Sequence, residues 1–226
     1  MAVVKFNKRS HRLIASIYPP VGIFDGFGNP EDAKAAMELE SQTNDRLTGA
    51  LGRLAAIPKE DWTTGAAGSH MAMAAFLHPS AGRKRFHRDS LLAWYAALTI
   101  ETAIRESLYH HTSRLAASDA NYPCPIQMRE LLSAPDAFLE DLTSEQTNRS
   151  ELYHQSDYSN SQAFGEEVRK SKSDGIIYNS VRHTGGTNIV IFRPRLLVPV
   201  IQGDHYQYTW DESGQPDVRK LTSISL

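Results

Sequence analysis

The stretch GRKRFHRDSLLAWYAALTIETAIRESLYHH, residues 82–111, decides the fold. A basic cluster runs into the apolar segment 91–98, whose aromatic and aliphatic residues predict a strand. Thr99 follows and can cap a helix, and Glu101 lies in the first turn, where a carboxylate suits the positive helix end. The stretch therefore predicts a strand that leads directly into a helix.

Two faces of this predicted helix differ in character. One face is apolar and has helical spacing, with Ile100, Ile104, Leu108 and His111. Another face carries Thr102, Glu106 and His110. Because residues three and four apart lie on the same side of a helix, we expect the first face to pack on the core and Glu106 to point elsewhere.

Composition limits the classes of protein that the chain can belong to. It has 226 residues, 41% hydrophobic and 22% charged, with a formal net charge of −2. This balance predicts a folded core and no direct binding to nucleic acid. A single cysteine, Cys124, suits a reducing compartment. We see no signal peptide and no apolar run of about 18 residues, so we expect a cytoplasmic protein without membrane insertion.

Other segments complete the expected architecture. Asn29 and Pro30 predict the start of a helical insertion over 30–57, with a break at Gly49 or Gly52. Further expectations are a strand over 69–79, a helix before the turn Asp174-Gly175, strands at 175–181 and 187–194, and a loose tail over 213–226. The irregular order predicts one α+β domain over 1–226, with a largely antiparallel sheet and flanking helices.

Common catalytic motifs are missing from the sequence. It has no glycine-rich dinucleotide or nucleoside triphosphate motif and no Gly-x-Ser-x-Gly. Its histidines are scattered without the spacing of a metal site, so no metal is expected.

Four residues nevertheless form a meaningful set. Arg85, Tyr95, Glu106 and Ser180 each have an ordinary explanation when taken singly. Together they supply what a dinucleotide needs: a guanidinium for a diphosphate, an aromatic face for a cationic nicotinamide, a carboxylate for an oxocarbenium-like transition state and a hydroxyl to orient it.

The motifs around these residues resemble the RES-domain family, the toxins of bacterial type II toxin–antitoxin pairs. The matching segments are Arg85-Phe86-His87, Tyr95-Ala96-Ala97, IETAIRE ending at Glu106, and SDGIIYNSVR with Ser180; HRLIASIYPP places Arg12 at a family arginine. The resemblance covers about residues 10–212. It departs from the family where Arg83 and Lys84 replace two glycines, which would allow the loop backbone to approach a phosphate closely. Arg83 competes with Arg85 as the phosphate-binding arginine, because it directly follows Gly82.

The resemblance implies a fold similar to ADP-ribosyltransferases, with a split sheet around a cleft for NAD⁺ as substrate. It implies cleavage of the nicotinamide–ribose bond and transfer of ADP-ribose to a protein side chain, phosphate or water. Arg85 and Arg12 would hold the phosphates, Tyr95 the nicotinamide end, and Glu106 and Ser180 the reacting ribose. A cognate antitoxin would block the cleft, and the insertion at 30–57 would dock any target protein.

Two other functions remain open from the sequence. Ser180 with His183 could serve a hydrolase, although no nucleophile elbow surrounds it. A degenerate domain that binds NAD⁺ without turning it over would agree with the lost glycines.

Overall fold

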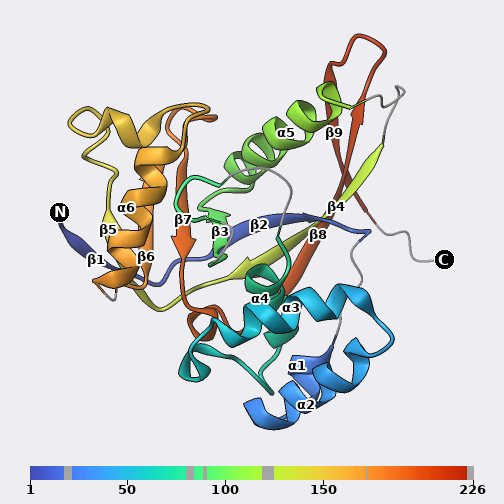
Figure 1. The fold of residues 1–226 in the computed structure, drawn as a ribbon. Coiled ribbons are helices and arrows are strands. Elements are labelled where there is room, and N and C mark those ends of the chain that lie inside the picture. Colours follow the sequence, from blue (N-terminus) through green and yellow to red (C-terminus); the bar gives the residue numbers. More distant parts are fainter. Residues whose placement is uncertain (18–21, 80–83, 89–90, 119–124, 172, 223–226) are drawn as a thin grey trace.

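The structure is a computed structural model that describes residues 1–17, 22–79, 84–88, 91–118, 125–171 and 173–222 (Figure 1). Its strands are β1 (Val3–Phe6), β2 (Ser10–Ala15), β3 (Trp94–Ala97), β4 (Ile126–Ser133), β5 (Ala137–Asp141), β6 (Gly175–Asn179), β7 (Thr187–Ile191), β8 (Ile201–Trp210) and β9 (Pro216–Leu221). Its α-helices are α1 (Ile23–Gly26), α2 (Pro30–Ser41), α3 (Asp45–Ala55), α4 (Ser69–Leu77), α5 (Ile100–Ala116) and α6 (Ser159–Lys170). Short 3₁₀ turns are η1 (Lys59–Asp61), η2 (Ser150–Tyr153) and η3 (Pro194–Leu196).

A nine-stranded sheet forms the frame of the described chain, in the order β1-β5-β6-β7-β3-β2-β4-β8-β9. The pairing of β5 with β6 is parallel, and the other pairings are antiparallel. One register pair, His11 with Ala97, joins β2 to β3, whereas six pairs join β2 to β4. The strands thus form one continuous sheet with its smallest register overlap between β2 and β3, and the predicted α+β class with a mostly antiparallel sheet is confirmed.

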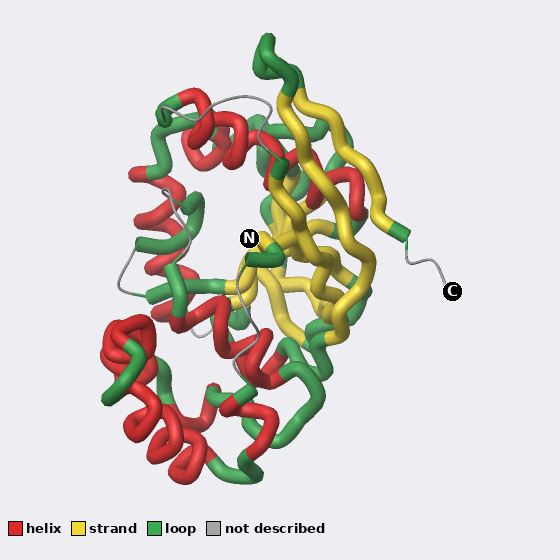
Figure 2. Tube along the Cα trace, turned by 90° about the vertical axis from the view of Figure 1, so that its right-hand side faces the viewer, coloured by secondary structure: helices red, strands yellow, loops and turns green. Residues whose placement is uncertain are grey.

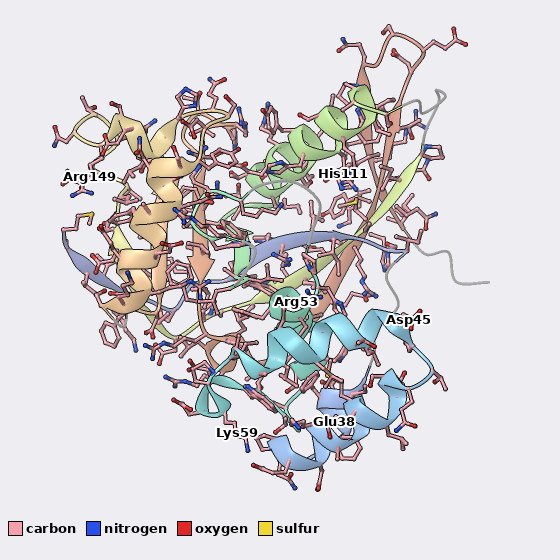
Figure 3. The ribbon with its side chains drawn as sticks, in the orientation of Figure 1. Glu38, Asp45, Arg53, Lys59, His111 and Arg149 are labelled. Atoms are coloured by element: carbon pink, nitrogen blue, oxygen red, sulfur yellow. The ribbon has the colours of Figure 1, made fainter. Side chains whose placement is uncertain are left out.

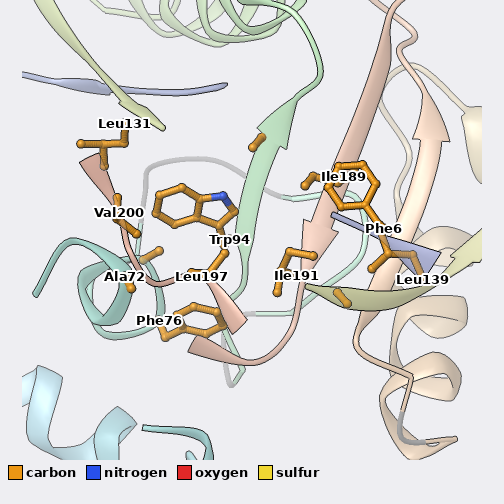
Figure 4. Close-up of a cluster of buried hydrophobic side chains, with 13 residues drawn as sticks. Phe6, Ala72, Phe76, Trp94, Leu131, Leu139, Ile189, Ile191, Leu197 and Val200 are labelled. Carbon is orange, nitrogen blue, oxygen red and sulfur yellow. The ribbon is translucent and has the colours of Figure 1, made fainter. Parts of the chain in front are cut away.

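The main core packs around β3, at the centre of the sheet. Trp94 is fully buried and belongs to a cluster of apolar side chains from other strands, from α4 and from the segment before β8 (Figure 4), which include Leu131, Ile191, Leu197, Val200, Ala72 and Phe76. Burying one large apolar side chain stabilises a fold by roughly 1.5–3 kcal/mol. This packing fixes β3 and therefore the position of Tyr95, the next residue along the strand.

The helix after β3 forms as predicted. The Thr99 hydroxyl accepts a hydrogen bond from the Thr102 amide, so Thr99 is the N-cap of α5. The apolar face of α5 packs against the other half of the sheet, with Ile100, Ile104 and Leu108 near Met128, Tyr206, Tyr208 and Trp210. Glu106 consequently points away from this core.

The N-terminal helical segment differs in detail from the expectation. Asn29 caps α2 by accepting from the Asp32 amide, as predicted. The predicted break at Gly49 or Gly52 is wrong, because α2 ends at Ser41 and both glycines lie inside α3. Glycine costs a helix roughly 1 kcal/mol. The buried stripe of α3, made by Leu47, Ala50 and Leu54, offsets that cost.

The strand predicted over 69–79 is also wrong, because this segment is the helix α4. The residues of α4 are apolar on all sides of the helix, and most of them are buried. The sequence therefore has no hydrophobic periodicity that would distinguish a helix from a strand. Alanine, methionine and leucine, which dominate it, are strong helix formers. Gly68 precedes it with φ +77°, and a Cβ there would lie 2.1 Å from the Val200 carbonyl oxygen.

The C-terminal tail is more ordered than expected. Residues 216–221, which were assigned to a loose tail, form β9 and pair antiparallel with β8. Figure 2 shows most of the helices gathered to one side of the twisted sheet. In the described part of the chain, no helix combines the length and apolar character that a membrane span requires.

Candidate active site

A cavity of about 540 Å³ lies between the sheet, α5 and the N-terminal helices. Its lining includes Arg12 of β2, Tyr95 of β3 and Glu106 of α5. It reaches the N-terminal helices through Arg53 of α3. Figure 3 shows Arg53 and His111, both lining residues, on opposite sides of β2. The cavity is large enough for a ligand of drug size or more.

Glu106 is held at the cavity wall by two hydrogen bonds to one oxygen. Its Oε1 accepts from Ser180 Oγ at 2.6 Å and from Asn188 Nδ2 at 2.7 Å. Ser180 follows β6 and Asn188 lies on β7, so three separate elements fix this carboxylate. Hydrogen bonds to a charged acceptor are stronger than neutral ones. No residue of the described ranges donates a hydrogen bond to the second oxygen of Glu106, which can therefore face a ligand. The structure therefore brings the predicted Glu106 and Ser180 into contact.

The loop from 180 to 186 positions Ser180 in turn. The Ser180 hydroxyl accepts from the amides of Arg182 and His183, and the Ser180 amide donates to the Gly186 carbonyl. The His183 side chain is hydrogen-bonded to Thr102 Oγ1 at 2.8 Å. No described histidine side chain contacts Ser180 Oγ. Its proton goes to Glu106, so this geometry does not provide the serine–histidine pair of a hydrolase.

Tyr95 uses its hydroxyl to hold the neighbouring segment 84–88. The phenol oxygen accepts from the Phe86 amide at 2.9 Å and lies 3.2 Å from His87 Nδ1. Burial raises the pKa of Tyr95, so its hydroxyl stays protonated. Tyr95 lines the cavity, and its side chain also packs against the buried cluster around Phe86 and Tyr178. The hydroxyl is thus engaged by protein, and Tyr95 contributes an aromatic residue to the cavity wall.

The two predicted arginines in the described chain, Arg85 and Arg12, differ in how far protein groups already occupy their guanidinium donors. Arg85 Nη1 donates to the carbonyls of Leu152 at 2.7 Å and His154 at 3.0 Å, and its guanidinium lies over the Tyr158 ring. Arg85 is 7% exposed, so much of its donor capacity anchors the 152–154 segment. Arg83, the predicted competitor, lies outside the described residues.

Arg12 lines the cavity beside Tyr95. Its guanidinium is 5.0 Å from the Trp94 ring centroid and, within the described chain, donates a hydrogen bond to the Tyr95 carbonyl at 3.1 Å. Burial lowers the pKa of Arg12 to about 10, and the group remains cationic at neutral pH. Arg12 keeps further donors for an anion beside Tyr95.

The charge of the cavity contrasts with that of the whole chain. Glu106 is the one carboxylate among its described lining residues, against seven basic side chains: Arg12, Arg53, Lys84, Arg85, Arg114, Arg129 and Arg182. Acidic residues outnumber basic ones in the chain, 26 to 24. The cations are therefore concentrated in the cavity, where they favour an anionic ligand.

Three histidines of the cavity lining, His87, His110 and His111, are kept neutral. Burial, with help from nearby arginines and Lys84, lowers the pKa of His87 to about 3 and those of His110 and His111 to about 4. A search of the described residues finds no group of three histidine, cysteine or acidic side chains arranged to hold a metal ion.

Asn188 and Thr102 are parts of the site that sequence reasoning missed. Asn188 is buried and pairs with Ala97 across the β3–β7 ladder. A polar residue inside the apolar strand TNIVI was the available signal, because a buried amide needs a partner. Thr102 was assigned to the face of Glu106, and its link to His183 could not be read from the sequence.

Comparisons with known proteins agree with the resemblance seen in the sequence. A family model described as RES domain matches residues 57–211. The chain is 26% identical over 219 residues to the uncharacterized protein y4oC of Sinorhizobium fredii, covering 93% of this chain and 86% of that protein. It is also similar to a chain in the crystal structure of the Mycobacterium tuberculosis MbcT–MbcA toxin–antitoxin complex. That likeness has a TM-score of 0.47 and 10% identity over 93% of this chain and 88% of the other, and it carries no argument about function.

Proposed function

The chain belongs to the RES-domain family, and we propose that it cleaves the nicotinamide–ribose bond of NAD⁺ and passes ADP-ribose to an acceptor. The observation that carries the proposal is the polarity of the cavity. Among the described lining residues, one fixed carboxylate, Glu106, lies with seven arginine and lysine side chains in a wall that also has many apolar residues. NAD⁺ has the complementary polarity, with a cationic nicotinamide ribose followed by two anionic phosphates.

The reaction follows from this polarity. The C–N bond between ribose and nicotinamide breaks with its electron pair on nitrogen, which neutralises the ring. The ribose is left with oxocarbenium character, and an acceptor oxygen or other nucleophile forms the new bond to the same carbon. A carboxylate held by Ser180 and Asn188 stabilises the developing positive charge without having to reorganise, which is the main requirement of electrostatic catalysis.

Each predicted site residue within the described chain has a role in this proposal. Glu106 stabilises the cationic ribose, and Ser180 orients Glu106. The Tyr95 ring stacks on the nicotinamide end. Arg12 binds the diphosphate. Arg85 supports the same region by tying segment 84–88 to the 152–154 carbonyls.

The biological setting is also part of the proposal. We propose that the chain is the toxin of a bacterial toxin–antitoxin pair, that it acts in the cytoplasm and that a cognate antitoxin covers the cavity. The acceptor is a target protein side chain, phosphate or water. Helices α2 and α3, which lie before the matched residues 57–211, offer a surface for a protein acceptor.

The test is an incubation of the purified protein with NAD⁺, with and without a bacterial lysate, in which free nicotinamide and protein-bound ADP-ribose are measured separately. Nicotinamide release with a modified protein identifies a mono-ADP-ribosyltransferase. Release with soluble ADP-ribose or its phosphate identifies an NAD⁺-depleting enzyme. Binding of NAD⁺ with no release in either condition contradicts the proposal and favours a non-catalytic binding module.

A further inference from the structure

Lys84 is held firmly although it lies in a loop segment. Its carbonyl accepts from Gln162 Nε2 at 3.0 Å. The next residue, Arg85, is tied to two carbonyls, and the Phe86 amide is tied to the Tyr95 hydroxyl. These hydrogen bonds fix the backbone at Lys84 and at the two residues that follow it. The side chain is part-buried and lines the cavity.

No described residue neutralises the Lys84 ammonium by an ion pair or a hydrogen bond. The charges that act on it most are those of Arg12 and Arg114, which repel it, and of Glu106, which attracts it. Oε1 of Glu106 already accepts two hydrogen bonds. A part-buried cation without a partner costs free energy, so this arrangement is favourable only when an anion enters the cavity.

The neighbours of Lys84 indicate which anion enters. Lys84 is close enough to interact electrostatically with both Glu106 and Arg12. If Glu106 faces the nicotinamide ribose, the next group along the dinucleotide is the diphosphate. Because Lys84, Glu106 and Arg12 line the same cavity, the ammonium of Lys84 would then meet the phosphate nearest to that ribose. A lysine ammonium binds phosphate as a compact charge with three donors.

We propose that Lys84 binds the diphosphate of NAD⁺ together with Arg12, as a substrate-binding residue at a position where the resembled family carries glycine. This inference rests on the proposed function. A glycine at this position would let the backbone approach the phosphate closely. In this chain the side chain of Lys84 would contact the phosphate instead.

The experiment compares Lys84→Met with the wild type on two substrates: NAD⁺ and nicotinamide riboside, which has the cationic ring and ribose but no phosphate. We expect KM for NAD⁺ to rise roughly 10- to 100-fold, as for loss of a charged hydrogen bond. The kinetics with nicotinamide riboside should change less than about twofold, because the lost contact is absent there. Lys84→Arg should restore most of the affinity for NAD⁺.

Arg88→Met is the matched control. Arg88 lies four residues away, its side chain is 57% exposed and it pairs with Glu166 outside the cavity lining. This variant should leave KM for both substrates unchanged. Binding of ADP-ribose, measured by calorimetry, supplies a readout that does not depend on turnover and should weaken in Lys84→Met alone.

Two results would overturn the inference. Equal losses on NAD⁺ and nicotinamide riboside would show that Lys84 acts on the fold or on the reacting ribose. An unchanged KM for NAD⁺, with an altered dependence of the rate on inorganic phosphate, would assign Lys84 to the acceptor. Absence of nicotinamide release by the wild type would refute the proposed function instead, and the ADP-ribose binding comparison would still decide the role of Lys84.

Discussion

Replacing Lys84 by methionine should stabilise the free protein. Burial and the nearby Arg12 and Arg114 lower the pKa of Lys84 from 10.5 to about 8, against the attraction of Glu106. One pKa unit corresponds to about 1.4 kcal/mol, so the full difference is about 3 kcal/mol. Lys84 is part-buried, and solvent screening reduces this value to roughly 1–3 kcal/mol. For a chain of this length the melting temperature should rise by about 3–8 °C at pH 7.

The pH dependence of this effect has a definite sign. The unfolded lysine binds its proton up to pH 10.5, whereas the folded one loses it near pH 8. The cost of burying the charge is therefore fully present below about pH 8 and disappears as the pH rises toward 10.5. His87, His110 and His111 titrate far below this range and do not contribute to it.

Thermal unfolding of the wild type and of Lys84→Met, followed by circular dichroism at pH 7 and pH 10, measures this difference in stability. We expect the gap between Lys84→Met and wild type to be largest at pH 7 and mostly gone at pH 10. The Arg88→Met control should unfold with the wild type at both pH values. A less stable Lys84→Met at pH 7, or a gap that does not depend on pH, would refute the reasoning that an uncompensated cation lies in the cavity.

Two further substitutions test the supports of the site. Tyr95→Phe removes the acceptor of the Phe86 amide and should lower stability by about 1–2 kcal/mol in chemical denaturation; an unchanged midpoint would contradict the bond. Ser180→Ala removes one of the two hydrogen bonds to Glu106 and should reduce kcat roughly 10- to 100-fold with little change in KM for NAD⁺. A raised KM at normal kcat would mean that Ser180 contacts the substrate instead.

Much of the fold around the site could be predicted from local sequence. The Thr99 cap, the apolar face of α5 and the strand that contains Tyr95 are determined by neighbours in the chain, and all three form as expected. The helix α4 could not be predicted, because a segment that is buried on all sides has no amphipathic period. The strand β9 forms by pairing with β8. The polar sequence of β9 gives no local signal for this tertiary contact.

The site itself was predictable in composition but not in geometry. The resemblance to the RES-domain motifs identified Glu106 and Ser180, which lie 74 residues apart in the chain and whose side-chain oxygens lie 2.6 Å apart in space. It could not show that Asn188 donates to the same oxygen. It also could not show that Arg85 donates hydrogen bonds to the Leu152 and His154 carbonyls, because such contacts depend on how distant loops pack.

The most direct measurement of the central claim is nicotinamide release from NAD⁺ by Glu106→Gln, which keeps the shape of the side chain and removes its charge. Glu101→Gln, on the exposed face of the same helix, is the control and should behave as wild type. We expect Glu106→Gln to lose at least about a hundredfold in kcat, as for loss of a preorganised electrostatic group, while ADP-ribose still binds and the fold still melts cooperatively. Nicotinamide release at the wild-type rate by a folded Glu106→Gln would contradict the assignment of Glu106 as the group that stabilises the cationic ribose.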